Sequence, residues 1–181
     1  MSYINRTWLT AREYLAQLAG GLVQVGRSVS VSVTRPDNVD PYTALDVIGT
    51  AATSTLTFNN VSVSEGGYAV IMGARLRMDT ASVPAGMGAF RLHLYSDDPT
   101  AIADNAAYNL PAADRAIHIG WVDIPAPEDL GDTIKAQDDN LNVTCSLLPG
   151  SRTIYGILQT IDACTIPAET NMQVTLNVAE V

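Results

Sequence analysis

The sequence predicts an all-β protein, a sandwich of two sheets, and three observations lead to this prediction. Apolar residues recur at every second position in much of the chain, and Val29, Val31 and Val33 alternating with serines are one example. A period of two is typical of strands that bury one face. The segments between these runs carry turn residues such as Gly66-Gly67 and Asp98-Pro99. Such chemistry suits short turns and loops rather than helical crossovers, which disfavours a parallel α/β fold.

One β domain of about eight strands is expected over residues 28–181. A chain of 181 residues suits a single domain with a short arm. The first strand holds the valine and serine alternation that begins at residue 28. The other alternating runs follow at 53–63, 68–78, 89–95, 116–124, 141–148, 152–161 and 172–181.

The expected strands each have a dry face and a wet face. In the run 68–78, Ala74, Leu76 and Met78 alternate with two arginines. In the run 89–95, the dry set is Phe90, Leu92 and Leu94, and the wet set is Arg91, His93 and Tyr95. Two sheets of this kind bury their apolar faces by packing against each other, which predicts a sandwich.

The first 27 residues differ from the rest of the chain and are expected to form a short helix or an extended arm. Trp8, Leu15, Leu18 and Leu22 approximate a helical stripe over residues 7–19, and Gly20-Gly21 ends it. A helix this short needs a partner surface to be stable. We expect these four side chains to be assembly contacts; docking on the chain's own sandwich is the alternative.

A hairpin is expected over residues 141–161, with Pro149-Gly150 as its connection. A tight connection places Cys145 opposite Ile154 and Leu141 opposite Leu158, which makes that face part of the core. The same register turns Tyr155, Ile157 and Gln159 outward. Tyr155 and Ile157 are therefore further candidate assembly contacts. Pro-Gly favours a type II turn, which fits a two-residue hairpin poorly, so the register stays open.

The two cysteines, Cys145 and Cys164, are expected to be buried and unjoined. Two cysteines are too few for a disulfide framework, and neither belongs to a CxxC or a Cys/His ligand pair. The hairpin register also places Ile154, rather than Cys164, opposite Cys145.

Composition excludes several partners. The net charge of -9 and the scattered placement of nine arginines and Lys135 disfavour nucleic acid. Apolar runs are much shorter than the roughly 18 residues of a membrane span, and the start of the chain lacks the pattern of a secretory signal. We expect neither a nucleic acid nor a membrane as partner.

Candidate chemistry is sparse, and we expect neither a catalytic site nor a cofactor or metal. His93 and His118 lie on strands without a neighbouring acid and nucleophile, which favours surface or cross-strand roles. The GxGxxG, GxxxxGK[ST], HExxH and GxSxG motifs are absent from the sequence. Aspartates cluster in three loops that could hold Ca²⁺, but none of these loops has EF-hand spacing. The clusters are Asp37, Asp40 and Asp46; Asp97, Asp98 and Asp104; and Asp129, Asp132, Asp138 and Asp139. With 6% aromatic residues, a glycoside hydrolase is disfavoured.

Several stretches resemble small virion proteins of tailed phages, of the head decoration or cement kind. They are "SVTRPDNVDPYTALDVIG", "LTFNNVSVSEGGYAVIMGARLRMD", "FRLHLYSDDPT" and "SRTIYGILQTIDACTIPAETNMQVTLNVAEV". The resemblance spans roughly residues 28–181 and depends on the order and spacing of these stretches, not on a chemical motif.

This resemblance implies a jelly-roll-like sandwich that is commonly trimeric and sits on a capsid lattice. The expected function is a non-enzymatic capsid decoration subunit that binds the major capsid protein and stabilises the head. It would be made in the host bacterial cytoplasm and end on the capsid surface of the virion. The alternative is a tail or head fibre module that recognises a host glycan through loops at one end of the sandwich.

Overall fold

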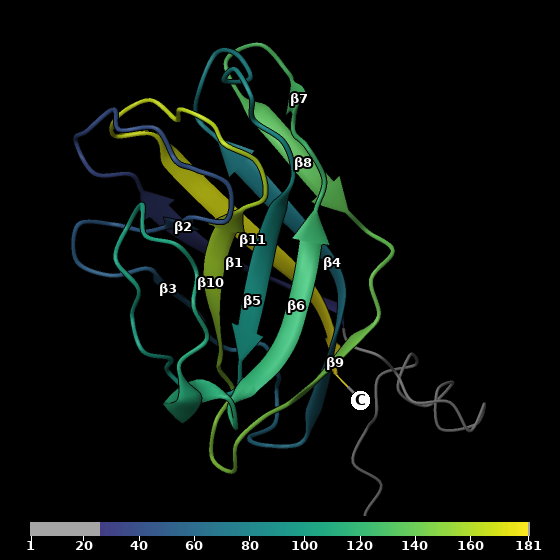
Figure 1. Cartoon of the computed structure of the whole chain (residues 1–181). Coiled ribbons are helices and arrows are strands. Elements are labelled where there is room, and N and C mark those ends of the chain that lie inside the picture. The colour runs from purple at the N-terminus through teal and green to yellow at the C-terminus, as the bar shows by residue number, and fades with distance from the viewer. Residues whose placement is uncertain (1–25, 181) are drawn as a thin grey trace, which may run out of the picture.

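The computed structural model describes residues 26–180, and this part of the chain is built from strands (Figure 1). Its one helical element is a 3-10 turn, η1, at Ala112–Asp114. The eleven strands are β1 (Gly26–Thr34), β2 (Val47–Ile48), β3 (Thr55–Phe58), β4 (Tyr68–Met78), β5 (Phe90–Tyr95), β6 (His118–Ile124), β7 (Glu128–Asp129), β8 (Ile134–Asp138), β9 (Val143–Ser146), β10 (Ile154–Thr160) and β11 (Asn171–Glu180). The all-β prediction is confirmed.

The strands form two antiparallel sheets. The six-stranded sheet has the order β1-β11-β4-β8-β7, and β9 pairs with the first half of β4, where β8 does not reach. The five-stranded sheet has the order β2-β10-β5-β6, and β3 pairs with β10 beside β2. Because β2 and β3 share one strand position, and β8 and β9 share another, the sandwich has eight principal positions plus the short β7. The expected number of strands is confirmed.

The order of pairing defines a jelly roll. The first position (β1) pairs with the last (β11), the second (β2 and β3) with the seventh (β10), the third (β4) with the sixth (β8 and β9), and the fourth (β5) with the fifth (β6). This is one long antiparallel double strand, rolled up so that β11 meets β4 and β10 meets β5. A sandwich with this order of pairing is a jelly roll, which consists of two Greek keys.

The core lies between the sheets and follows the predicted alternation. Ala74, Leu76 and Met78 are buried, as are Phe90, Leu92 and Leu94, so the dry faces of both runs are confirmed. Burial of these side chains is the main stabilising term of such a sandwich. The core is closely packed at Gly156, because a Cβ there would lie 2.9 Å from Cδ1 of Leu92.

The predicted hairpin over 141–161 is wrong. β9 pairs with Tyr68–Ile71 of β4, whereas β10 belongs to the other sheet, so the connection through Pro149-Gly150 crosses from one sheet to the other. Cys145, Ile154 and Leu158 are still buried, as expected of inward positions. Alternation reports which face is buried and carries no information about the pairing partner, which here is distant in sequence.

The sequence did not predict the strand β8, which lies in an acidic segment. Ile134 and Ala136 point inward and are buried, and they alternate with Lys135 and Gln137. This alternation covers only a few residues and is flanked by aspartates. It was therefore too short to distinguish a strand from a solvated loop.

Both cysteines are free and buried, which confirms the prediction that they are not joined. The register that supported it was wrong, but the result does not depend on that register. Cys145 lies in β9, and Cys164 forms an isolated bridge with Tyr42 at the other side of the fold. Burial raises the pKa of the Cys145 thiol to about 12 and that of the Cys164 thiol to about 11, so both stay protonated and unreactive near neutral pH.

Candidate functional site

The outer face of the six-stranded sheet is polar and open to solvent. We call this the bare face; its outward residues are Ser28, Ser30, Ser32, Thr34, Arg75, Arg77, Gln173, Thr175 and Asn177. None of these side chains is buried in the part of the chain that the structure describes. Short hydrogen bonds run across it, from Ser28 Oγ to Asn177 Oδ1 and between the hydroxyls of Ser30 and Thr175. The face is an array of hydrogen-bonding side chains, and Tyr68 and Met72 of β4 are exposed beside them.

The outer face of the five-stranded sheet is covered by the chain itself. Residues 96–117, which we call the cover segment, connect β5 to β6 and pass over β10 and β2, where Figure 1 shows them as the teal loop. Val47, Tyr95 and Ile157 form a second small core beneath it. The cover segment contributes Ile102, Tyr108, Leu110 and Ile117. The part of this face beneath the cover segment is therefore dry, although its residues alternate with the main core, whereas Trp121 and the Arg91–Asp123 ion pair on β5 and β6 are partly exposed.

The cover segment overturns three expectations. Tyr95 and His93 were expected on a wet face, but they are 0% and 5% exposed. Ile157 was expected to point outward, and it does leave the main core, yet it is 1% exposed under the cover segment. Alternation on a strand cannot reveal that a distant loop will cover its outer side.

The other candidate assembly residues have different positions. Tyr155 is half-buried at the edge of the second core, and its role in assembly stays a prediction. Trp8, Leu15, Leu18 and Leu22 lie outside the described residues, as does nearly all of the expected arm. The first described strand begins at Gly26, two residues before the expected start of the domain.

A histidine cluster lies between the cover segment and the sheet; its members are His93, His118, Tyr95, Tyr108 and Gln159. The rings of His93 and Tyr108 stack with centroids 3.6 Å apart and planes 9° from parallel. His118 lies across the strand pair, 5.7 Å from His93 and edge-on to Tyr95 at 5.1 Å. The hydroxyls of Tyr95 and Tyr108 are hydrogen-bonded at 2.8 Å. Both histidines are thus cross-strand residues, and His93 is not on the surface.

The electrostatics of this cluster favour neutral rings. Burial lowers the pKa of His93 to about 4, although its hydrogen bond to Gln159 partly opposes this shift. Burial also lowers the pKa of His118. Within residues 26–180, neither ring is hydrogen-bonded to a carboxylate or a nucleophilic hydroxyl, which is the arrangement that general base catalysis requires.

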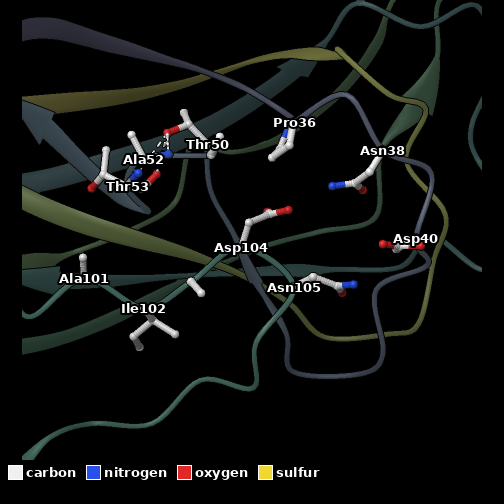
Figure 2. Close-up of a pocket in the computed structure, with 12 residues that line it drawn as sticks. Pro36, Asn38, Asp40, Thr50, Ala52, Thr53, Ala101, Ile102, Asp104 and Asn105 are labelled. Carbon is white, nitrogen blue, oxygen red and sulfur yellow. Dashed lines mark hydrogen bonds between the residues drawn. The ribbon is translucent and has the colours of Figure 1, made fainter.

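A groove of about 740 Å³ opens at one end of the sandwich, among the loops that flank β2 and the first part of the cover segment (Figure 2). Asp104 lies in its wall, and its Oδ1 accepts hydrogen bonds from the Tyr42 hydroxyl and the Gly49 amide, each at 2.8 Å. Asn38 and Asp40 line the opposite side. The apolar part of the lining comes from Pro36, Ala51, Ala52, Ala101, Ile102 and Ala103.

The walls of this groove are fixed by hydrogen bonds between loops. Asp104 ties the cover segment to the loops at Tyr42 and Gly49, and the buried Asp46 holds the turn at Thr43 within the neighbouring loop. Ser54 Oγ accepts a bond from the Ile102 amide. Such ties hold the polar groups of the groove in place before any ligand arrives, which is the usual condition for a binding site. The sequence offered no signal for this groove beyond the aspartates, because three separate loops form it.

The acidic clusters do not converge on a metal site in the described part of the chain. Over residues 26–180, no three side chains of histidine, cysteine, aspartate or glutamate come together in a way that could hold a metal ion. Asp46 and Asp104 are occupied in structural bonds, and Asp139 pairs with Arg75 at 3.0 Å. A search of the same residues found no helix that is long and apolar enough to span a membrane.

Comparisons with known proteins assign the chain to no family. No family model matches the sequence, and no curated protein matches it. A bacterial lipoprotein from Bacteroides thetaiotaomicron is similar with a TM-score of 0.34 and 10% identity, over 86% of this chain and 83% of that one. A chain of the Israeli acute paralysis virus full particle has a TM-score of 0.34 and 11% identity, over 98% and 81%. For Desmodium yellow mottle tymovirus the values are 0.27 and 10%, over 88% and 89%. At these TM-scores the similarities assign no function.

Proposed function

We propose that this chain is a structural protein of a virus particle, a capsid decoration subunit that binds the major capsid protein of a tailed phage and has no catalytic role. The observation that carries the proposal is the bare face, because a complete jelly roll presents a sheet of mainly polar side chains, with Tyr68 and Met72 also exposed on β4, that none of the described residues covers. The resemblance of residues 28–181 to phage decoration proteins supports the same function.

The side chains of the bare face suit a water-mediated contact that is repeated in each copy of the subunit. Serine and threonine hydroxyls donate and accept hydrogen bonds, lose little conformational entropy and leave room for bridging water. Each copy then contributes a modest contact, and the sum over many copies stabilises the shell. Salt bridges such as Arg75–Asp139 lie at the same side and are half-exposed, so a partner can compete for them.

The proposed partners follow from this function. The subunit associates with copies of itself, as a trimer by the resemblance, and sits over junctions of the shell on the outer surface of the virion. Its synthesis takes place in the host bacterial cytoplasm. Tyr155 and the apolar residues of the N-terminal segment are the proposed contacts between subunits or with the shell.

The test is to add purified protein to heads that lack it and to count the bound copies by mass spectrometry. We expect saturable binding in proportion to the number of shell subunits, and a rise in the temperature at which the heads release DNA. The matched variants are Ser30→Arg, which alters the bare face, and Ser82→Arg, which makes the same charge change in the exposed loop after β4. Loss of binding with the first alone supports the proposal, and failure of the unmodified protein to bind heads contradicts it.

A second candidate function is a fibre module that recognises a host glycan, and the groove at the end of the sandwich favours it. Asp104 and Asn38 offer a fixed acceptor and an amide that sugar hydroxyls can bind. The lining lacks an aromatic side chain on which a sugar ring could stack. A glycan array distinguishes the two functions: binding that disappears in Asp104→Ala, with few copies per particle, would favour the fibre module.

A further inference from the structure

The hydrogen bonds around His93 determine which nitrogen of its ring carries the proton. The amide nitrogen of Gln159 donates to the Leu45 carbonyl at 2.9 Å, so the amide oxygen of Gln159 faces His93. The Nε2 of His93 donates to this oxygen at 3.1 Å. The Nδ1 of His93 is buried and has no hydrogen-bond partner. The neutral ring therefore forms its side-chain hydrogen bond through Nε2 and leaves Nδ1 without a partner.

Adding a proton to Nδ1 would place a charge and an unpaired donor inside the second core. The titratable, charged and polar groups that face His93 come from every element around it: Arg91 and Tyr95 on β5, His118, Trp121 and Asp123 on β6, Gln159 on β10 and Tyr108 on the cover segment. Arg91 and His118 both oppose the charge. Asp123 favours it, but this carboxylate already forms two hydrogen bonds with Arg91.

One contact favours the protonated ring. Tyr108 stacks on His93, and a cation above an aromatic face is attracted to it. That attraction is weaker than the loss of hydration for a buried charge whose donor has no acceptor. When His93 is protonated, the sum of these two effects therefore favours a conformation in which water reaches its Nδ1. The direct way to admit water is to move Tyr108, which covers the ring.

The cover segment is held unequally along its length. Its first half is tied to β2 by backbone hydrogen bonds, from the Asn105 amide to the Val47 carbonyl and from the Val47 amide to the Ala106 carbonyl. Residues 108–117 are held by two backbone bonds, from the Tyr108 amide to the Leu45 carbonyl and from the Ser96 amide to the Ile117 carbonyl. The buried Asp114 carboxylate also accepts bonds from the amide and hydroxyl of Thr100, and the Tyr95 hydroxyl and apolar packing hold the rest. Of these bonds only those to Leu45 and Tyr95 reach outside the cover segment, and a loop with few bonds to its sheet opens at lower free energy than the sheet itself.

We propose that residues 108–117 are an acid-sensitive latch: protonation of His93 displaces Tyr108, opens this part of the cover segment and exposes Tyr95 and Ile157, while the jelly roll stays folded. The latch makes a new apolar surface available only in acid. It does not depend on the proposed function, since every group that it uses lies within one chain.

The size of the response follows from the titration of His93. Its pKa of about 4 in the closed form, against the ordinary value of 6.5, means that the closed form resists protonation. The closed form is therefore fully favoured above pH 6.5 and loses its advantage as the pH falls toward 4. If the open form has the ordinary value, the ratio of open to closed molecules rises about 30-fold between pH 7.5 and pH 5.

Hydrogen exchange read by NMR at pH 7.5, 6 and 5, corrected for intrinsic rates, tests the latch. Amide protection in residues 108–117 should fall about 30-fold by pH 5, while protection in β11 and β4 should not change. Binding of an apolar fluorescent dye should rise over the same range. A side-chain NMR titration of His93 in the unmodified protein gives its own midpoint, which should lie near pH 4 and below the midpoint of lost protection, because protection begins to fall near pH 6.5.

Two variants make the test specific. His93→Phe keeps an aromatic ring against Tyr108 and cannot be protonated, so it should abolish the acid response. His118→Phe is the matched control and should retain it, because His93 is unchanged. Protection that stays constant to pH 5, falls together with that of the sheets, or falls equally in His93→Phe would overturn the proposal. If His93→Phe does not fold, the two midpoints in the unmodified protein decide the question.

Discussion

The two sheets of this jelly roll have outer faces of opposite character. On the bare face, outward positions such as Ser30 and Thr175 meet solvent. On the other sheet, the equivalent outward positions, such as Ile157 and Tyr95, are as buried as the main core because the cover segment lies over them. The same period of two therefore produced one half-wet sheet and one sheet whose outer face is dry where the cover segment lies over it. We propose contacts outside the chain for the bare face and the acid-sensitive latch for the covered face.

The largest difference in stability is expected between two truncations at outward positions, one on each sheet. Ile157→Ala removes a buried side chain beneath the cover segment and should lower the free energy of unfolding by about 2 to 4 kcal/mol. Thr175→Ala on the bare face should change it by no more than about 1 kcal/mol, because only an exposed hydrogen bond is lost. Urea denaturation of both variants measures the difference. Equal effects would mean that the two faces do not differ in the way described.

The next effect concerns how the cover segment is anchored. Asp104→Ala should destabilise the protein by about 1 to 3 kcal/mol, because the hydroxyl of Tyr42 and the amide of Gly49 lose their shared acceptor. Asp98→Ala is the matched control, since this exposed aspartate in the same segment accepts none of the described hydrogen bonds. Thermal unfolding of the two variants provides the comparison. A similar fall in both would mean that charge, rather than anchoring, is responsible.

The sequence predicted one of these two faces and missed the other for a physical reason. Alternation predicted β4 with the bounds Tyr68–Met78 that the structure has, and it predicted the exposed serines of β1. The cover segment has no period, because a loop that lies over a sheet contributes apolar residues wherever its path allows. Ile102, Tyr108 and Leu110 show this irregular spacing. Candidate site residues on β10 were therefore assigned to the correct side of the strand but to the wrong environment.

Long-range pairing is the second feature that local patterns could not supply. The run that became β9 and the run that became β10 were assigned to each other because a Pro-Gly turn separates them. In the structure each pairs with strands about 60 or more residues away in sequence. The groove at the end of the sandwich has the same origin, since it combines loops that only the jelly-roll topology brings together.

A smaller effect should distinguish hydrogen bonding from packing under the cover segment. Tyr108→Phe keeps the ring stacked on His93 and removes the hydroxyl that bonds Tyr95. The free energy of unfolding should fall by about 0.5 to 1.5 kcal/mol. Tyr155→Phe is the control, because its half-buried hydroxyl forms none of the described hydrogen bonds. A loss in Tyr108→Phe as large as that in Ile157→Ala would show that the hydroxyl pair, and not apolar burial, holds the cover segment.

The smallest effect on stability is expected from deletion of residues 1–25, although it should have the largest effect on assembly. β1 begins at Gly26 and pairs with β11 along its whole length, so the deletion leaves every described strand in place. The melting temperature should therefore shift by no more than about 4 °C, the change that about 1 kcal/mol produces in a domain of this size. Binding to heads, or self-association measured by sedimentation, should be lost.

Point variants in the full-length chain separate assembly from folding. Trp8→Ala with Leu18→Ala removes two apolar contacts that the sequence assigns to assembly, and Thr7→Ala with Thr10→Ala is the control in the same segment. The apolar pair should weaken association and leave the melting temperature unchanged, because a short apolar stripe stabilises a complex only through a partner surface. If the deletion unfolds the protein, or the apolar pair lowers the melting temperature while association persists, this segment belongs to the fold of its own subunit and the assembly prediction is wrong.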